Sequence, residues 1–310
     1  MTQFSDDASV AILAYPGVQM SAVLGLADLF MIASGNSNRA DGPELTVTQL
    51  TLPASAKSND YDAVILPPNL TGARGEDATD ILRWLRNQHA TGTIMCSVCA
   101  GAFWLGHAGL LSGRPATTHW ALEGEFRAAF PDVELAAEHL LVDDNDIVTA
   151  GGLMAWVDLG LFVVNRFLGP QTVSQTARHL LVDPGGREQR NYRSFRPPLG
   201  HGDAPVLKVQ HWLEAHCETE ISVKDMAARS HLSPRTFLRR FKAATGYTPI
   251  AYLQNLRIEK ARGLLERTRI PVNEIGWRSG YADPSAFGRL FLKATGLTPG
   301  EYRGRFGVQS

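Results

Sequence analysis

The sequence lacks three features that mark whole classes of protein: a cysteine framework, a long apolar run and a basic leader. Three cysteines among 310 residues cannot build a disulfide scaffold, so we expect a reducing, cytoplasmic location. The longest apolar stretch, residues 153–169, is shorter than the ~20 residues of a membrane span and includes Asp158 and Arg166. We therefore expect a buried helix there and no membrane partner. Residues 1–10 show neither a basic segment nor a long apolar stretch, so we expect no secretory signal.

Charge is moderate overall but unevenly divided. The composition, 44% hydrophobic and 20% charged, is that of a globular protein, and the length suits about two domains. Residues 1–200 carry 13 Lys and Arg against 21 Asp and Glu, whereas residues 201–310 carry 17 against 10. Unless surface charge clusters here by chance, this division predicts a polyanion partner for the C-terminal part alone.

A polar segment without apolar periodicity separates the two parts. Residues 183–205 begin with an Asp-Pro-Gly-Gly turn, contain further prolines and follow neither a helical nor a strand pattern. We therefore predict one domain over residues 8–183, a linker over residues 184–204 and a second domain over residues 205–307.

Apolar runs of strand length alternate with helical patterns in the N-terminal part. This alternation is typical of a parallel sheet covered by helices on both faces. We predict an α/β, doubly wound, mostly parallel sheet of the flavodoxin-like kind, followed by an all-α domain. The predicted strands are residues 10–15, 63–66 and 93–97 with a hairpin at 139–142 and 147–149, and the predicted helices are residues 21–33, 77–89, 100–109 and 153–167.

The all-α prediction rests on an internal repeat. Pro234, Phe237, Phe241 and Gly246 recur 50 residues later as Pro284, Phe287, Phe291 and Gly296. Each copy has a short helix, a tight turn and a second helix that begins with proline and stops at glycine, as helix ends prefer. The repeat therefore predicts two helix-turn-helix units.

The second helix of each unit has an apolar face and a basic face. Phe237 and Phe241 are four residues apart and share the core side, which leaves a polar side for DNA. We expect double-stranded DNA to be contacted by Arg235, Thr236, Arg239, Arg240 and Lys242 in the first unit and by Ser285, Arg289 and Lys293 in the second. A helical module for protein partners is the alternative.

The connecting segment sets the spacing of the two units. Residues 249–267 are strongly helical, and nineteen residues at ~1.5 Å each span roughly 28 Å. One turn of DNA is about 34 Å long. We therefore expect the units to reach successive major grooves on one face of DNA that bends slightly.

A second candidate site lies where an apolar strand runs into a helix, at residues 93–101. Cys99 falls at the apex, and small residues after it, Ala100 first, permit a sharp turn of the nucleophile-elbow kind. A thiol at a helix N-terminus is activated, and His119 follows at a distance in sequence that allows it to approach. We expect Cys99, Ala100, His119 and Ser21 to form a ligand pocket.

The chain resembles known families on these motifs. Residues 205–307 resemble the AraC/XylS-type DNA-binding domain, whose signature is matched by Gly280, Tyr281, Asp283, Ser285, Phe287, Phe291, Gly296, Thr298, Pro299 and Tyr302. Residues 8–170 resemble the PfpI-like branch of the class I glutamine amidotransferase fold, most closely over residues 97–120. This order of domains is that of the GlxA-like transcriptional regulators. The resemblance implies a homodimer, a small amino-acid-like or quaternary-amine effector and, for an activator, contact with RNA polymerase.

One element of the amidotransferase-like site is missing. In enzymes of that superfamily an acid from the first loop contacts the thiol, but residues 15–22 contain neither Asp nor Glu. We therefore expect a sensing domain without catalysis, with a cysteine-dependent amidase or deglycase and a thiol redox sensor as alternatives. Cys96-x-x-Cys99 has no second pair, and the acidic turn at residues 143–146 lacks the Gly and Glu of a calcium loop, so we expect no metal and no cofactor.

Overall fold

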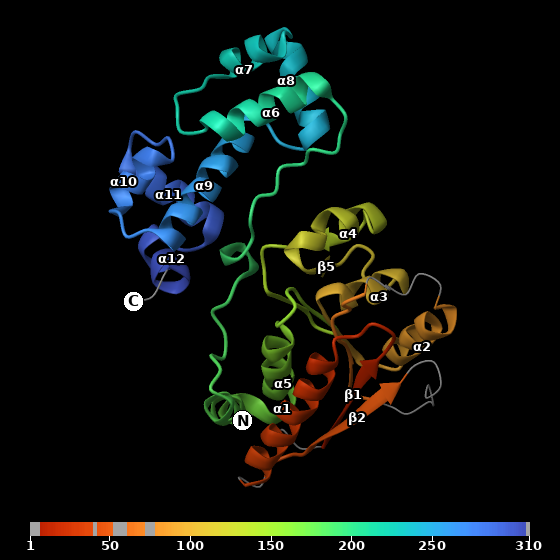
Figure 1. The fold of residues 1–310 in the computed structure, drawn as a ribbon. Helices are drawn as coiled ribbons and strands as arrows, with labels where there is room; N and C mark the ends of the chain where they lie inside the picture. The colour runs from red at the N-terminus through yellow and green to blue at the C-terminus, as the bar shows by residue number, and fades with distance from the viewer. Residues whose placement is uncertain (1–6, 40–41, 52–60, 72–77, 308–310) are drawn as a thin grey trace. The chain divides into compact units, whose positions relative to one another are not determined.

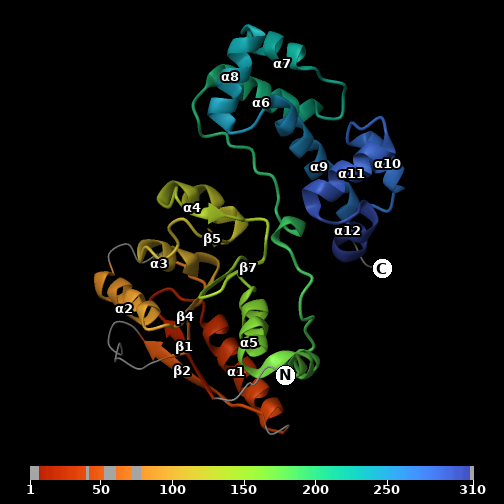
Figure 2. The same ribbon diagram turned by 180° about the vertical axis from the view of Figure 1, so that it is seen from behind.

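The computed structural model describes residues 7–39, 42–51, 61–71 and 78–307. The chain divides into two compact units, Met1–Gln189 and Arg190–Ser310 (Figures 1 and 2). The division falls inside the predicted linker, residues 184–204. The residues on either side of it pack onto the unit to which they belong, so each unit is described below with its own share of this segment.

A six-stranded sheet with the order β2-β1-β3-β4-β8-β7 is the centre of the first unit. All neighbours are parallel except β7 and β8, which form an antiparallel hairpin. This sheet confirms the predicted fold class, because parallel strands in the order 2-1-3-4 with helices between them are flavodoxin-like. The strands are β1 (Ala8–Ala14), β2 (Leu45–Thr51), β3 (Ala63–Leu66), β4 (Ile94–Val98), β7 (Leu141–Asp144) and β8 (Ile147–Ala150).

Successive side chains of each strand serve opposite faces of the sheet. In β1, Val10 and Ile12 belong to a core shared with α1 (Met20–Asn38) and α5 (Trp156–Leu180), whereas Ala11 and Leu13 belong to a separate core on the other face. That other face is covered by α2 (Thr79–Ala90), α3 (Ala102–His107) and α4 (Glu123–Ala129). Burial on both faces explains why the strands read as continuous apolar runs.

Helix α1 packs closely on α5. A side chain at Gly25 would collide with the indole ring of Trp156, so glycine lets the two helices approach. Among the described residues α1 is the one helix long and apolar enough to cross a membrane, and half of its apolar window is buried inside the unit.

Helix α5 and the edge of the sheet differ from the sequence prediction. The helix was expected to end at residue 167 but extends to Leu180 across a break at Gly169 (φ 81°), because Pro170 has the fixed φ that restarts a helix. Strand β2 was not predicted, since its Thr and Gln residues leave no continuous apolar run of the kind used to predict the other strands. The short pair β5 (Pro115–Ala116) and β6 (Glu134–Leu135) was also missed, and the predicted start of α2 at residue 77 lies outside the described residues.

The second unit is all-α over residues 190–307, which confirms that prediction. Its helices are α6 (Ala204–His216), α7 (Val223–Ser230), α8 (Pro234–Thr245), α9 (Pro249–Arg267), α10 (Val272–Arg278), α11 (Pro284–Thr295) and α12 (Pro299–Phe306). Two small cores form, one around Phe237 and Phe241 and one around Phe287 and Phe291. Helix α9 contributes to both cores, so the repeated units are joined by one continuous helix (Figure 2).

Residues 190–203 run along both helix-turn-helix halves as a strap. At one end Arg305 Nη2 donates to the Tyr192 hydroxyl at 2.7 Å, and the guanidinium of Arg262 donates to the Arg193 carbonyl. Further on, the Phe195 ring packs on Tyr252 with centroids 5.1 Å apart. The strap therefore contacts α9 and α12 of the second half and the core of the first half.

Candidate functional site: a nucleic-acid interface and a cysteine elbow

Helix α8 presents three of its five predicted DNA contacts to solvent. Arg235, Arg239 and Lys242 are exposed on the side opposite the buried Phe237 and Phe241. The helix starts at an N-cap serine and stops at Gly246 (φ 77°). Three cations separated by three or four residues form one stripe along the helix, which suits a polyanion.

Thr236 and Arg240 have structural partners instead. Thr236 is half-buried, and its hydroxyl accepts a hydrogen bond from the Ser233 hydroxyl at 2.9 Å. The guanidinium of Arg240 donates to both carboxylate oxygens of Asp203, from Nε at 2.9 Å and from Nη2 at 2.8 Å. Arg240 lies about 100° around the helix from Arg239, which turns it toward the start of α6 rather than along the exposed stripe.

Helix α11 repeats the arrangement with fewer charges. Ser285, Arg289 and Lys293 are exposed at four-residue intervals, while Phe287 and Phe291 are buried. Asp283 caps the helix by accepting hydrogen bonds from two backbone amides, at 2.8 and 3.1 Å. The structure thus brings three predicted residues of each helix onto one exposed face, whereas Thr236 and Arg240 lie beside the face of α8.

The cysteine elbow forms at the end of β4. Cys99 has φ 56°, a left-handed conformation that non-glycine residues seldom adopt, and it is only 5% exposed. A side chain at Gly101 would collide with the carbonyl oxygen of Leu66 at the end of β3. Strain at Cys99 and close approach at Gly101 together give the sharp turn that the sequence predicted.

Residues at the ends of the neighbouring strands β1 and β3 pack together beside the elbow. The Tyr15 hydroxyl, just after β1, donates to the Pro67 carbonyl just after β3, and burial raises the pKa of Tyr15 far above its usual value. The Tyr15 ring lies 5.0 Å from the ring of Trp104 on α3. The carboxyl ends of β1, β3 and β4 therefore meet at this edge, where open α/β folds place ligands.

Thr118 contacts the elbow, and His119 follows it in the chain. The Thr118 hydroxyl donates to the Cys99 carbonyl at 2.8 Å, and Nδ1 of His119 accepts from the Ala121 amide at 3.0 Å. Because Nδ1 accepts, a neutral His119 carries its proton on Nε2. In that tautomer Nε2 is a hydrogen-bond donor and not a base.

The remaining predicted pocket residues have other neighbours. Ala100 is buried in the core shared with α1 and α5, directly after Cys99. Ser21 is exposed in the first turn of α1 and accepts a hydrogen bond from the Gln19 amide at 2.9 Å. Helix α3, whose N-terminus was expected to activate the thiol, has only six residues and follows a 3-10 turn, so its dipole is small.

Two buried glutamines near these segments were not among the residues predicted from the sequence. Gln19 is 6% exposed in the first loop, and its Oε1 accepts no hydrogen bond from the described residues. Gln189 is 2% exposed; its Nε2 donates to the carbonyls of Thr118 at 2.8 Å and His139 at 2.9 Å, and its Oε1 accepts from the Trp120 amide at 3.0 Å. No local pattern marks Gln189, because these partners are 50 to 71 residues away in sequence.

The other cysteines lie in cores. Cys96 is buried in β4, and burial raises its pKa to about 12, so its thiolate is scarce at neutral pH. Cys217 is buried in the second unit, and burial raises its pKa as well. In the part of the chain that the structure describes, no group of three His, Cys, Asp or Glu residues could hold a metal ion.

Comparison with known proteins identifies both units. Residues 226–305 match the helix-turn-helix domain and residues 31–166 the DJ-1/PfpI family. The chain is 28% identical to the HTH-type transcriptional regulator CdhR of Pseudomonas aeruginosa over 226 residues, 72% of this chain and 66% of that protein. It is also 28% identical to the HTH-type transcriptional regulator GlxA of Rhizobium meliloti, over 72% of this chain and 69% of that protein.

A solved structure resembles the first unit. Drosophila melanogaster DJ-1beta aligns with a TM-score of 0.48 and 20% identity over 57% of this chain and 99% of that chain. The alignment with CdhR spans just under two thirds of its length. On these sequence matches, the chain joins a DJ-1/PfpI domain to an AraC-type helix-turn-helix domain.

Proposed function

We propose that the protein is a DNA-binding transcriptional regulator controlled by a small metabolite that binds its DJ-1/PfpI domain. The observation that carries the proposal is the pair of exposed basic faces on α8 and α11, each on the second helix of a helix-turn-helix unit. Such helices enter the major groove, where arginine reads guanine edges or phosphates. The names of the relatives CdhR and GlxA support the same function.

Arg239 and Arg289 are the residues that test the DNA-binding part. They occupy equivalent positions in the repeat and are both exposed. DNA selected from a random pool by the wild-type protein serves as the target. Arg239→Ala and Arg289→Ala should each weaken binding by about tenfold or more, since a bidentate guanine contact contributes about 1–3 kcal/mol. Arg86→Ala, an exposed arginine on α2, is the matched control, and equal affinities for all four proteins would contradict the proposal.

Three features support sensing rather than catalysis at the elbow. The first loop, residues 15–22, contains neither Asp nor Glu, and the neutral His119 ring carries its proton on Nε2. The buried Cys96 thiol, with its raised pKa, is a poor partner for redox exchange. Incubation with amides and glycated amines tests the amidase or deglycase alternative, and turnover that disappears in Cys99→Ser would establish it.

A chain of hydrogen bonds links the elbow to the connection between the units. Thr118 binds the Cys99 carbonyl through its hydroxyl and the Gln189 amide through its own carbonyl. Gln189 immediately precedes Arg190, the first residue of the DNA-binding unit. A ligand that shifts the elbow can therefore move the residue from which the connection starts. We further propose a cytoplasmic homodimer that contacts RNA polymerase if it activates transcription.

A further inference from the structure

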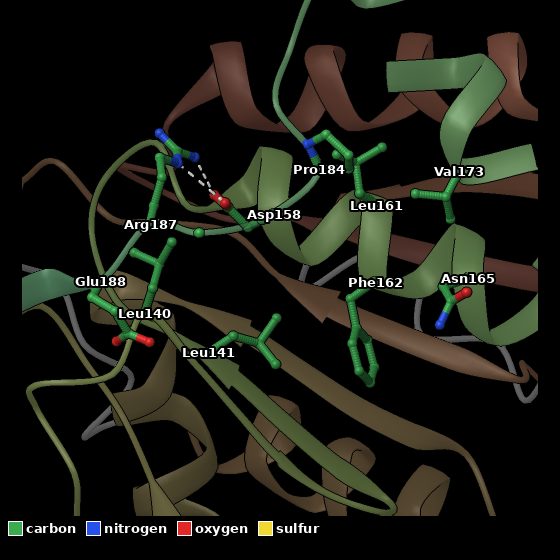
Figure 3. A pocket seen from close by; sticks show the side chains of 12 residues that line it. Leu140, Leu141, Asp158, Leu161, Phe162, Asn165, Val173, Pro184, Arg187 and Glu188 are labelled. Carbon is green, nitrogen blue, oxygen red and sulfur yellow. Dashed lines mark hydrogen bonds and ion pairs between the residues drawn. The ribbon is translucent and has the colours of Figure 1, made fainter. Parts of the chain in front are cut away.

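The charged side chains of a cavity beside α5 are already paired. The cavity has a volume of about 440 Å³, and its lining includes Arg187 and Asp158, which form a bidentate ion pair with Nε donating to Oδ1 at 3.1 Å and Nη2 to Oδ2 (Figure 3). Glu188, also in the lining, is partly exposed and lies 3.5 Å from His139. Among the described residues this lining therefore shows no unmet charge. Certain apolar side chains of the second unit are less well matched to their surroundings.

An exposed leucine lies on each recognition helix, which is the second helix of its helix-turn-helix unit. Leu238 on α8 is 41% exposed, and Leu292 on α11 is 43% exposed. Each leucine follows an exposed arginine by three residues, Arg235 in α8 and Arg289 in α11. Residues three apart lie one above the other on a helix. Both leucines therefore belong to the faces that carry the exposed cations.

Packing inside the unit does not explain these leucines. The buried phenylalanines of the repeat are the same in both copies, but the leucines are not. Gly288 stands in α11 at the place of Leu238, and Lys242 stands in α8 at the place of Leu292. A side-chain carbon at Gly288 would meet no described atom within 4 Å. Because glycine or lysine can fill these places, the leucines are not needed by the core of the repeat.

Leucine on such a face can recognise one feature of a base edge. Its side chain neither donates nor accepts a hydrogen bond, and the apolar group that the bases show in the major groove is the C5-methyl group of thymine. Against guanine, adenine or cytosine, leucine would displace water from polar atoms without replacing the lost hydrogen bonds, which costs affinity. Leucine therefore favours thymine over the other three bases.

We propose that Leu238 and Leu292 determine sequence specificity, each by packing on the C5-methyl group of a thymine. This inference rests on the proposed DNA-binding function and adds the base that each leucine selects. Three residues span about 4.5 Å along a helix, close to the distance of about 3.4 Å between base pairs. The thymine therefore lies next to the base pair that the preceding arginine, Arg235 or Arg289, faces.

The two halves of the target DNA differ as a consequence. Leu292 occupies the repeat position of Lys242, four residues beyond that of Leu238. Four residues are about 6 Å along the helix. The thymine is therefore contacted one turn later by α11 than by α8, although the two units share one fold.

The test replaces single thymines by deoxyuridine, which removes the C5-methyl group and keeps every hydrogen-bonding group of the base. The DNA is a sequence that the wild-type protein selects from a random pool, and its affinity is measured for the full chain. Deoxyuridine at one position in each half should weaken wild-type binding about fourfold, the usual effect of exposing one buried apolar carbon. Binding that is unchanged by deoxyuridine at every thymine would overturn the proposal.

Four variants assign each thymine to its leucine. Leu238→Ala should bind thymine and deoxyuridine equally at one position, and Leu292→Ala should do so at the other. Leu238→Met and Leu292→Met keep an apolar contact and should keep the preference for thymine. Leu199→Ala, at a leucine of similar exposure (42%) outside the recognition helices, is the matched control and should keep both preferences. A preference that persists at both positions in Leu238→Ala or in Leu292→Ala would overturn the proposal, because another group would then contact the methyl.

Wild-type affinities for selected and random DNA separate this inference from the proposed function. A chain that prefers the selected DNA but is indifferent to the methyl groups would refute the thymine contacts and leave the regulator intact. A chain that binds neither DNA would refute both.

Discussion

Arg240 on the first recognition helix is paired with Asp203, the N-cap residue of α6, through two hydrogen bonds of 2.9 and 2.8 Å. Asp203 also accepts from the Val206 amide at 3.2 Å, so one carboxylate caps α6 and binds α8. Bidentate pairs of this kind are geometrically specific. We therefore expect Arg240, which sequence reasoning assigned to DNA, to hold in place the helix from which its neighbour Arg239 projects.

Arg239→Ala and Arg240→Ala should affect different properties, although the residues are adjacent: the first DNA binding and the second stability. Arg239→Ala should weaken DNA binding and lower its salt dependence while leaving the melting temperature unchanged. Arg240→Ala should lower the melting temperature and leave the salt dependence unchanged. Thermal melts and binding isotherms at several salt concentrations check both, and a salt dependence reduced equally in the two variants would return Arg240 to the interface.

The Asp203–Arg240 pair should also depend on pH. The guanidinium of Arg240 holds the pKa of Asp203 below its usual value in the folded protein. A depressed carboxyl pKa contributes stability above the unfolded pKa of about 4 and loses it as pH falls through the folded pKa. Wild type should therefore exceed Asp203→Asn in stability at pH 7, and the difference should shrink below about pH 4. Urea unfolding at pH 7 and below pH 4 measures this difference in unfolding free energy. A difference that does not change with pH would mean that Asp203 stabilises the protein only as the N-cap of α6 and not through its charge.

The two recognition helices should differ in their share of the electrostatic binding. Helix α8 exposes Arg235, Arg239 and Lys242, whereas α11 exposes Arg289 and Lys293. Each phosphate contact contributes about 0.9 to the slope of log affinity against log salt. Neutralising the three cations of α8 should thus reduce the slope more than neutralising the two of α11. An equal or larger reduction from α11 would show that the second unit makes the main phosphate contacts.

Because residues 190–203 contact the helices of the DNA-binding unit, we expect this strap to belong to that unit. A fragment of residues 190–310 should melt at a higher temperature than a fragment of residues 205–310, because the shorter one loses the contacts of Tyr192 and Phe195 with the helices. Within the full chain Phe195→Ala should lower the stability of this unit by about 2 kcal/mol, as a partly buried aromatic side chain does. Leu199→Ala, at an exposed position of the same strap, is the control. Identical melting of the two fragments would confirm the predicted domain start at residue 205.

Sequence reasoning succeeded where the determining interactions are local. Proline at a first turn and a left-handed glycine at the end placed α8 and α11 within one residue of their observed ends, and α9 was predicted over its full length. Residues whose roles depend on distant partners were invisible: Asp203 and Arg240 are 37 residues apart, and Gln189 binds a carbonyl 71 residues away. The elbow was found because an apolar strand followed by small residues is a local pattern in the sequence.

The elbow prediction concerns Cys99 as a pocket residue without catalytic duty. Its side chain sits at the carboxyl edge of the sheet in a strained, buried position, where a ligand is expected. A metabolite that raises the melting temperature of the wild type binds the native state, and one that also changes the affinity for DNA serves as the effector. Cys99→Ser keeps the size and polarity of the side chain and should keep most of the response of DNA binding to that effector. Cys99→Trp should fill the site and abolish the response while DNA affinity without effector stays unchanged. Loss of the response in Cys99→Ser, together with a covalent adduct on the wild-type thiol in mass spectrometry, would instead establish cysteine chemistry at the elbow.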